Sequence, residues 1–264
     1  MYVKGVIKVM IMDKESKTTP RAGVSDLSIA VVYDNNPHKD GLESAWGFSC
    51  LITTAQKNIL FDTGGDGSLL LNNMEKLAID PNKIDIVVLS HIHGDHTGGL
   101  AGFLQRNPKV TVYLPKSFSG RFKDNVRSYG SKIVEVEQFL KVCEDVYSIG
   151  ELGRWIKEQS LIIRTKAGMI IIIGCAHPGI INIVNATKGL LRDNILLIMG
   201  GCHLEWATKG KIEKIVSFLG QWQVCYIAPC DCSGDKARNL FKKHFGKNYI
   251  NTGVGKVITM MDLQ

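Results

Sequence analysis

The sequence lacks any long apolar run, and this absence argues against a membrane protein. No uncharged apolar stretch reaches the length needed to cross a bilayer. The first residues, 1–12, have too short an apolar core and the wrong flanks for a secretory leader. We therefore expect no targeting segment and no membrane contact.

A disulfide framework is also missing. The chain has 7 cysteines, an odd number, and their spacing follows no paired pattern. Together with the expected lack of a leader, this indicates a reducing compartment, and we expect the protein to be cytoplasmic.

Arginine-rich runs and basic stripes interleaved with aromatic residues are absent, which leaves little support for a nucleic-acid partner. The net charge is nevertheless +7, from 32 Lys and Arg against 25 Asp and Glu. Such a balance favours a small anionic substrate, although solvated surface lysines produce it equally well. The length of 264 residues permits one large domain or two fused halves. The sequence does not decide the oligomeric state, so a homo-oligomer stays open.

What the sequence does have is a concentration of histidine. Three of its 7 histidines, with one aspartate between the last two, fall within the segment 90–99, Ser-His-Ile-His-Gly-Asp-His-Thr-Gly-Gly. The preceding run at 84–89 is apolar and β-branched, which is typical of a buried strand. The histidines therefore leave a strand end and enter a glycine-rich turn, where open α/β sheets place their chemistry.

Imidazole and carboxylate are the usual zinc and iron ligands, so this turn predicts a metal site. In an extended turn His91 and His93 point the same way and can bind one ion, while Asp95 and His96 point toward a neighbouring position. Four ligands from one turn cannot all reach one tetrahedral ion, which favours two metal ions over one. The competing interpretation is a polar loop whose histidines are incidental.

Apolar periodicity and turn residues predict strands that alternate with helices along most of the chain. The region 128–158 has no chemical motif, and we interpret it as a connection and a cover over the site. Predicted strands cover 5–12, 27–33, 46–52, 58–61, 84–89, 110–114, 132–136, 146–149, 161–165, 169–174, 195–199, 223–228 and 256–260. Predicted helices cover 67–77, 98–105, 118–126, 179–188, 211–219 and 235–244.

The pattern His91-x-His93-x-Asp95-His96 resembles the signature of the metallo-β-lactamase superfamily. This resemblance implies an α/β fold, the four-layer αβ/βα sandwich, in which two mixed sheets face each other with helices outside. It also implies a one- or two-metal site where the edges of the sheets meet. We expect a single domain over 1–264, built from two αβ halves of about 1–130 and 131–264.

The resemblance assigns roles to residues that follow other strands. His177, in Gly-Cys-Ala-His-Pro-Gly, matches the third ligand of the first metal, and the alternative is a structural histidine at a strand end. Asp62, in Phe-Asp-Thr-Gly, matches an aspartate that braces the metal-bearing turn without ligating. The alternative for Asp62 is the N-cap of the helix that follows.

The second metal position departs from the related pattern. In the branch of the superfamily that is related to dihydropteroate-type synthases, the sequence at this position is Pro-Thr-His-Cys-Thr-Gly. This chain has Asp231 there, between Cys230 and Cys232. A carboxylate there makes a harder site that favours iron, manganese or magnesium over zinc, or else leaves the second metal weak or absent. Four cysteines flank these turns, and they are either small apolar filler or a thiolate site. They are Cys175, Cys202, Cys230 and Cys232.

His203 occupies the position where other members of the superfamily place a bridging ligand. Because neutral imidazole does not bridge two ions as carboxylate does, we expect it to bind a substrate phosphate or a developing negative charge. A purely structural histidine is the alternative. Ser233 is a further candidate for contact with substrate, and Asp95 is the candidate that orients and deprotonates the attacking group.

The motifs most resemble a branch of metal-dependent hydrolases related to dihydropteroate-type synthases of methanopterin biosynthesis. Gly94 stands where flavodiiron oxidoreductases carry a glutamate ligand, which disfavours di-iron redox chemistry. The resemblance implies a hydrolase or transferase that uses one or two Zn, Fe or Mn ions on a small anionic substrate. A condensation of a pterin diphosphate with an aminobenzene phosphate is one form. The alternatives are a plain phosphodiester, lactone or thioester hydrolase and a catalytically lapsed metal-binding sensor or scaffold.

Overall fold

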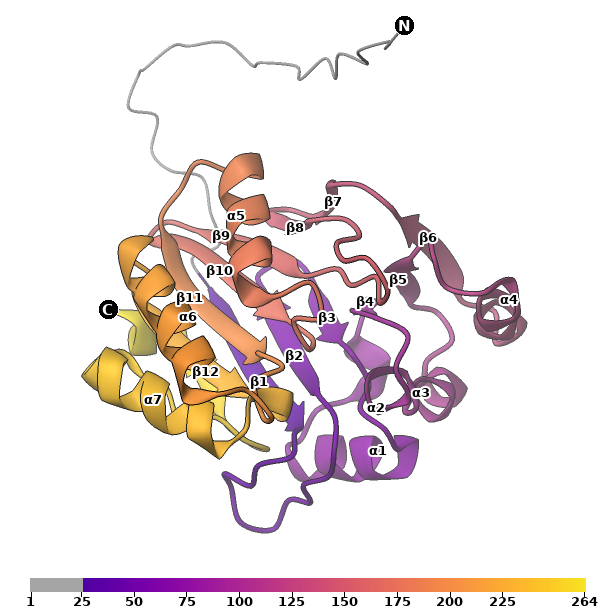
Figure 1. Ribbon diagram of the computed structural model, residues 1–264. Coiled ribbons are helices and arrows are strands. Elements are labelled where there is room, and N and C mark those ends of the chain that lie inside the picture. Colours follow the sequence, from indigo (N-terminus) through magenta and orange to yellow (C-terminus); the bar gives the residue numbers. More distant parts are fainter. Residues whose placement is uncertain (1–25) are drawn as a thin grey trace, which may run out of the picture.

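The computed structural model of the protein describes residues 26–264, so the strand predicted over 5–12 lies outside the described residues. Two mixed sheets dominate the described part of the chain (Figure 1). The first has the order β13-β1-β2-β3-β4-β5-β6 and the second β12-β11-β10-β9-β8-β7. The strands of the first sheet are β1 (Leu27–Tyr33), β2 (Ser49–Thr54), β3 (Asn58–Phe61), β4 (Ile86–Val88), β5 (Thr111–Pro115), β6 (Lys132–Val136) and β13 (Val257–Thr259). Those of the second are β7 (Leu140–Cys143), β8 (Val146–Ser148), β9 (Leu161–Thr165), β10 (Gly168–Ile173), β11 (Ile195–Gly201) and β12 (Tyr226–Cys230).

Helices cover the outer face of each sheet, as the two groups of coils in Figure 1 show. Beside the first sheet lie α1 (Gly67–Lys76), α2 (Gly94–Thr97), α3 (Leu100–Arg106) and α4 (Gly120–Ser128). Beside the second lie α5 (Ile180–Leu190), α6 (Lys209–Gln221) and α7 (Asp235–Phe245). Among the described helices none is both long and apolar enough to cross a membrane.

Three apolar clusters correspond to the three interfaces between these layers. One lies between the two sheets and includes Ile29, Phe61 and Ile172. The other two pack each sheet against its own helices. Strand β10 has every residue buried because it contributes to clusters on both of its faces. The predicted four-layer αβ/βα sandwich is thereby confirmed.

Local differences from the prediction have identifiable causes. The helix expected over 98–105 corresponds to α3, and a short helix that was not predicted, α2, precedes it and begins directly after His93. Strand β7 was not predicted, because its short sequence lies in a charged region without alternation. Strand β13 comes from the C-terminal half but pairs with β1 in the first sheet, with Ile258 opposite Ile29. The single domain over 1–264 stays a prediction.

Parallel pairing places the chemistry at one end of the sheets. Strand β3 pairs in parallel with β4, and β11 pairs in parallel with both β10 and β12. Because parallel strands end at the same edge, the turns after these five strands approach one another. All the strand-end turns that the sequence singled out follow these strands.

Candidate metal centre

Three histidines from two different sheets converge at this edge. The Nε2 atom of His91 lies 3.1 Å from Nδ1 of His93 and 3.2 Å from Nε2 of His177. These residues form one group in which all the ligand atoms lie within 4.8 Å of one another. His177 is 86 positions from His91 along the chain, so the fold and not the local sequence brings it here. We call His91, His93 and His177 the first trio.

A second trio lies beside the first and consists of Asp95, His96 and Asp231. The Nε2 atom of His96 is 3.6 Å from Oδ2 of Asp95 and 3.5 Å from Oδ2 of Asp231. The rings of His91 and His96 have centroids 4.2 Å apart, so the two trios are adjacent. The six residues predicted as ligands are thus brought together in the arrangement expected of two neighbouring metal positions.

Asp62 links the two trios through hydrogen bonds. Its Oδ2 atom accepts hydrogen bonds from Nδ1 of His96, at 2.8 Å, and from Oγ of Ser90, at 2.7 Å. Its Oδ1 accepts from the backbone N–H of Ser90. The side chain is fully buried, and Asp66, not Asp62, caps the helix α1. The carboxylate therefore has the position expected of a brace for the histidine-bearing turn.

The same contacts determine which nitrogen of His91 faces its neighbours. Because the hydroxyl of Ser90 donates to Asp62, the 2.9 Å contact between Ser90 Oγ and His91 Nδ1 requires the imidazole to donate. Burial and the neighbouring histidines hold the pKa of His91 well below its ordinary value, so the ring is neutral. Its Nε2 lone pair then points at the other members of the first trio, as a metal ligand requires.

Electrostatics favour cations at the second trio. Burial alone would lower the pKa of His96, but the carboxylates of Asp62 and Asp231 raise it well above its ordinary value. Burial lowers the pKa of His177 to about 4, with a further contribution from His203. The lowered pKa values of His91 and His177 favour their neutral, metal-binding form, and the carboxylates around His96 are the other ligand type that a divalent ion binds.

The turn that carries His177 depends on a residue that the sequence did not single out. Glu158 is fully buried, and its carboxylate accepts from the backbone N–H groups of Cys175 (2.9 Å), Ala176 (3.0 Å) and His177 (2.7 Å). Burial raises the pKa of Glu158, against the lowering effect of these three donors. The only signal in the sequence was an acidic residue just before an apolar strand, which is too common to be informative.

Backbone strain concentrates in the same turns. Seven non-glycine residues with positive φ occur in the described chain, and four of them follow the strands that end at the site. These four are Asp62, Ala176, His203 and Asp231. Gly174 adds a close approach, since a Cβ there would collide with the side chain of Ser90. Strain of this kind persists where surrounding structure enforces it, and it is typical of functional sites.

A third buried carboxylate holds the turn of Asp231. The Oδ2 atom of Asp34 accepts from the backbone N–H of Asp231 at 3.1 Å, and its Oδ1 accepts from the backbone and side chain of Asn36. Burial raises the pKa of Asp34 to about 6. The carboxylate of Asp231 is thereby left free to face His96.

Unsatisfied polar atoms test whether the residues fit a metal. Five buried side-chain polar atoms have no hydrogen-bond partner within the described residues, and three belong to the second trio. They are Nε2 of His96 and both carboxylate oxygens of Asp231. Burying such atoms costs free energy unless something binds them. The donor types and their unsatisfied state therefore fit a divalent metal ion.

The two residues predicted to contact substrate differ in position. His203 is exposed at the mouth of the site, where its ring lies 4.5 Å from that of His177 between centroids. Ser233 is fully buried. Its hydroxyl donates to the carbonyl of Cys230 and accepts from the N–H of Cys202. These two bonds connect the turns after β11 and β12, and substrate contact by Ser233 stays a prediction.

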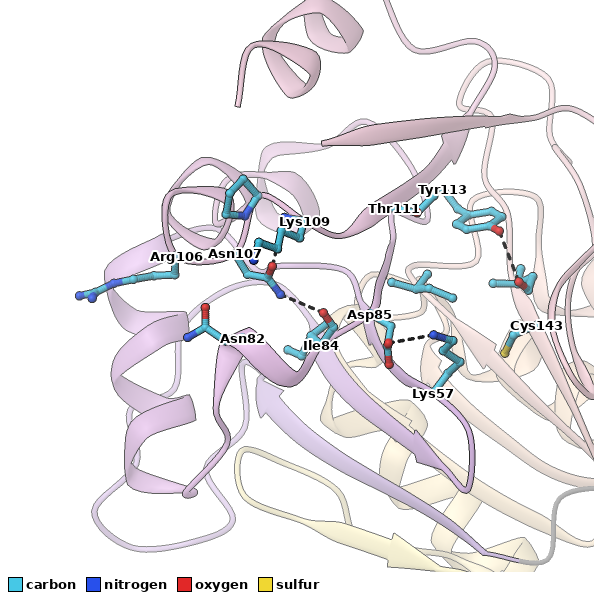
Figure 2. Close-up of a pocket in the computed structure, with 13 residues that line it drawn as sticks. Lys57, Asn82, Ile84, Asp85, Arg106, Asn107, Lys109, Thr111, Tyr113 and Cys143 are labelled. Carbon is cyan, nitrogen blue, oxygen red and sulfur yellow. Dashed lines mark hydrogen bonds and ion pairs between the residues drawn. The ribbon is translucent and has the colours of Figure 1, made fainter. Parts of the chain in front are cut away.

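Two cavities open beside the trios. One of about 220 Å³ is lined by Trp46, His203, Trp206 and Lys211 among others, and one of about 580 Å³ includes Arg154, Trp155 and His177. A further cavity of about 640 Å³ lies at the starts of β4 and β5, at the opposite end of β4 from the histidines. Figure 2 shows its lining, where Lys57 pairs with Asp85 across 2.9 Å. Its lining contains none of the clustered ligands, so we place no chemistry there.

Comparison with known proteins agrees with this geometry. The sequence profile of the metallo-β-lactamase superfamily matches residues 47–161, which include the whole histidine-rich turn. This chain contains a metallo-β-lactamase domain. A solved metal-dependent hydrolase of the β-lactamase superfamily has 29% sequence identity and a TM-score of 0.75, covering 88% of this chain and 98% of that one.

Curated relatives of this metallo-β-lactamase domain differ in their reactions. The 7,8-dihydropterin-6-methyl-4-(β-D-ribofuranosyl)-aminobenzene-5'-phosphate synthase of Methanocaldococcus jannaschii is 28% identical over 248 residues, covering 77% of this chain and 84% of its own. A ribonuclease Z of Pediococcus pentosaceus is 32% identical over 135 residues, which cover 46% of this chain and 40% of its own. The comparisons therefore identify the domain, whereas the reaction is a matter for proposal.

Asp231→Asn separates metal binding from folding stability. Asparagine keeps an oxygen 3.5 Å from Nε2 of His96 but loses the charge that helps to raise the pKa of that histidine, so we expect the free energy of unfolding of the metal-free protein to fall by about 1–2 kcal/mol. Asparagine tolerates the positive φ at this position. We expect elemental analysis to find two bound ions in the unmodified protein and one in this variant.

The exposed Asp235, four positions further on, supplies the control, and Asp235→Asn should keep both ions. Two ions retained in Asp231→Asn would exclude Asp231 as a necessary ligand.

Proposed function

We propose that this protein is a metal-dependent hydrolase or transferase that acts on a small anionic substrate at the two trios. The convergence of six ligand-type side chains, with buried unsatisfied atoms on His96 and Asp231, carries this proposal. Divalent ions held there would polarise a substrate oxygen and lower the pKa of a bound water. Zn, Fe and Mn all suit the nitrogen and oxygen donors.

The chain's own residues have distinct tasks in this proposal. Asp95 is partly exposed, with 23% of its side chain accessible, so its carboxylate can accept a proton from the attacking group. His203, exposed beside the first trio, can donate a hydrogen bond to a substrate phosphate or a developing anion. Asp62 and Glu158 hold the ligand turns in place without touching substrate.

The mouth of the site supports a planar anionic substrate. Three tryptophans that line the two cavities are unusually exposed: Trp46 at 52%, Trp155 at 87% and Trp206 at 91%. Each cavity also contains a cationic side chain, Lys211 in one and Arg154 in the other. An exposed indole beside a cation suits a flat ring that carries a phosphate.

A two-part substrate is the form of the proposal that these cavities favour. One cavity includes His203 and the other His177, and these two rings are 4.5 Å apart. Two ring-bearing phosphates bound in the two cavities would meet at the trios. This supports a condensation of a pterin diphosphate with an aminobenzene phosphate, in line with the dihydropterin–aminobenzene phosphate compound in the name of the M. jannaschii synthase. Hydrolysis of a phosphodiester, lactone or thioester at the same ions is the alternative.

Metal depletion and reconstitution test the proposal. Protein stripped with a chelator is expected to lose all turnover and to regain it with Zn, Mn or Fe. A synthase is expected to be inactive on either substrate alone and active on the pair, whereas a hydrolase cleaves a single ester. Trp155→Ala and Trp206→Ala should raise KM more than they lower kcat, while the remote Trp222→Ala should change neither. Stoichiometric metal binding without turnover on the pair or on any ester would overturn the enzymatic assignment.

A further inference from the structure

Two cysteines lie inside the candidate metal centre. The Sγ atoms of Cys175 and Cys232 are 2.8 Å apart, although the residues are 57 positions apart in sequence. Cys175 precedes His177 in the turn after β10, and Cys232 follows Asp231 in the turn after β12. The two thiols therefore connect the turns that carry one member of each trio.

Cys175 belongs to three groups of potential metal ligands. Its sulfur forms one compact group with His91 and His96, a second with His177 and His203, and a third with Asp231 and Cys232. In each group all the ligand atoms lie within 4.8 Å of one another. Its Sγ lies 3.5 Å from Nδ1 of His203. The thiol pair thus occupies the space between the two trios.

Packing does not account for this pair. Cys50 and Cys230 belong to the apolar cluster between the sheets, and Cys202 belongs to the cluster beneath α5, α6 and α7. Cys175 and Cys232 belong to none of the three apolar clusters of the described chain, although both are buried. A small apolar filler would contact apolar neighbours, as the other three cysteines do.

A buried carboxylate without hydrogen-bond partners completes the group. Asp231 is only 3% exposed, and neither of its carboxylate oxygens has a hydrogen-bond partner in the described chain. A Cβ on Gly201 would meet Sγ of Cys232 at 2.8 Å and Oδ2 of Asp231 at 3.0 Å, so these two atoms lie side by side above the glycine. Glycine at 201 leaves space for these two atoms.

We propose that Cys175 and Cys232 are ligands of the metal centre, and that with Asp231 they form a thiolate–carboxylate site for a thiophilic ion such as Zn²⁺. Each thiol releases its proton to solvent as its sulfur binds the ion, so no oxidant or reductant is involved. This inference rests on the proposed metal centre and adds sulfur to its ligands. It also reverses the preference expected from Asp231 alone, since thiolates select zinc over manganese and magnesium.

Cobalt spectroscopy on the full chain tests the proposal. Reduced, metal-stripped protein is loaded with Co²⁺, and its absorption is recorded in the visible and near-ultraviolet ranges. Visible ligand-field bands report cobalt bound by any of the ligands, whereas near-ultraviolet sulfur-to-cobalt charge transfer requires a thiolate. We expect both signals from the unmodified protein. Cys175→Ser and Cys232→Ser should each weaken the charge-transfer band at least twofold and keep the visible bands.

Cys202→Ala is the matched control, because Cys202 is a neighbouring buried cysteine that packs in an apolar cluster. It should retain both signals. X-ray absorption of the zinc-loaded unmodified protein provides a second readout that needs no variant, and it should show sulfur at about 2.3 Å from zinc.

The outcomes separate this inference from the proposed function. Visible bands without charge transfer, together with no sulfur around zinc, would overturn the thiolate ligands and leave a His and Asp metal centre standing. A failure of cobalt and zinc to bind at all would overturn the metal centre itself. Loss of the charge-transfer band in Cys202→Ala alone would place the thiolate on the wrong residue and also overturn the assignment.

Discussion

Asp62→Ala is expected to abolish binding of both metal ions and to lower the free energy of unfolding of the metal-free protein by about 3–5 kcal/mol. Asp62 orients one histidine of each trio, His96 directly and His91 through Ser90. Its removal leaves the raised-pKa His96 buried without its closest carboxylate. Elemental analysis and chemical denaturation measure the two effects.

The variant Asp62→Asn tests the effect of the negative charge apart from the effect of the backbone conformation. Residue 62 has φ +56°, a conformation that asparagine adopts at a lower cost than alanine. We expect a smaller loss, about 1–3 kcal/mol, since the amide keeps one acceptor but repels one of the donors. The exposed Asp124, which pairs with Arg127 at the surface, is the control. Asp124→Asn should change stability by less than about 1 kcal/mol. Full metal occupancy in Asp62→Ala would contradict the bracing role.

Glu158→Gln is expected to weaken binding of the ion at the first trio by about 10–100-fold. Three consecutive backbone N–H groups, from Cys175 to His177, converge on this one carboxylate. A glutamine side chain has only one acceptor oxygen. Its NH2 group would therefore face a backbone N–H, and two donors cannot form a hydrogen bond. The turn of His177 then shifts, while His91 and His93 keep their places. Competition against a chelator of known affinity measures the change.

Glu137→Gln is the matched control for Glu158, because Glu137 is an exposed glutamate in a surface ion pair with Lys116. We expect it to leave metal affinity unchanged. Glu158→Ala should have a larger effect than Glu158→Gln. We expect it to lower the free energy of unfolding by about 3–5 kcal/mol, since it leaves three buried donors unpaired. Equal metal affinity in Glu158→Gln and the unmodified protein would refute the positioning role.

Strong local patterns explain why most of the fold was predictable. Strands such as β1 and β10 are runs of apolar, β-branched residues bounded by turn residues, and their predicted limits agree with the structure to within about one residue. Short segments in charged surroundings were harder, as β7 illustrates. The turn from His91 to His96 was informative because its residue types have no packing value there, so their concentration had to have a chemical reason.

Pairs distant in sequence were decided by tertiary structure. The contact of Glu158 with the turn of His177, and that of Cys175 with Cys232, involve residues with no shared local motif. Sequence alone treated Asp231 as a hard ligand and left the flanking cysteines as filler or a thiolate site, because Cys175 approaches Cys232 only when β10 and β12 end at the same edge.

By itself the sequence determined most strands and helices through periodicity, and through the family resemblance it implied the layered fold, the candidate ligands and the bracing role of Asp62, because these signals lie within local segments. Only the tertiary structure decided that Glu158 and Asp34 hold the other ligand turns and which sulfurs lie among the ligands. Such contacts follow from parallel strands ending together at one edge, which no single segment encodes.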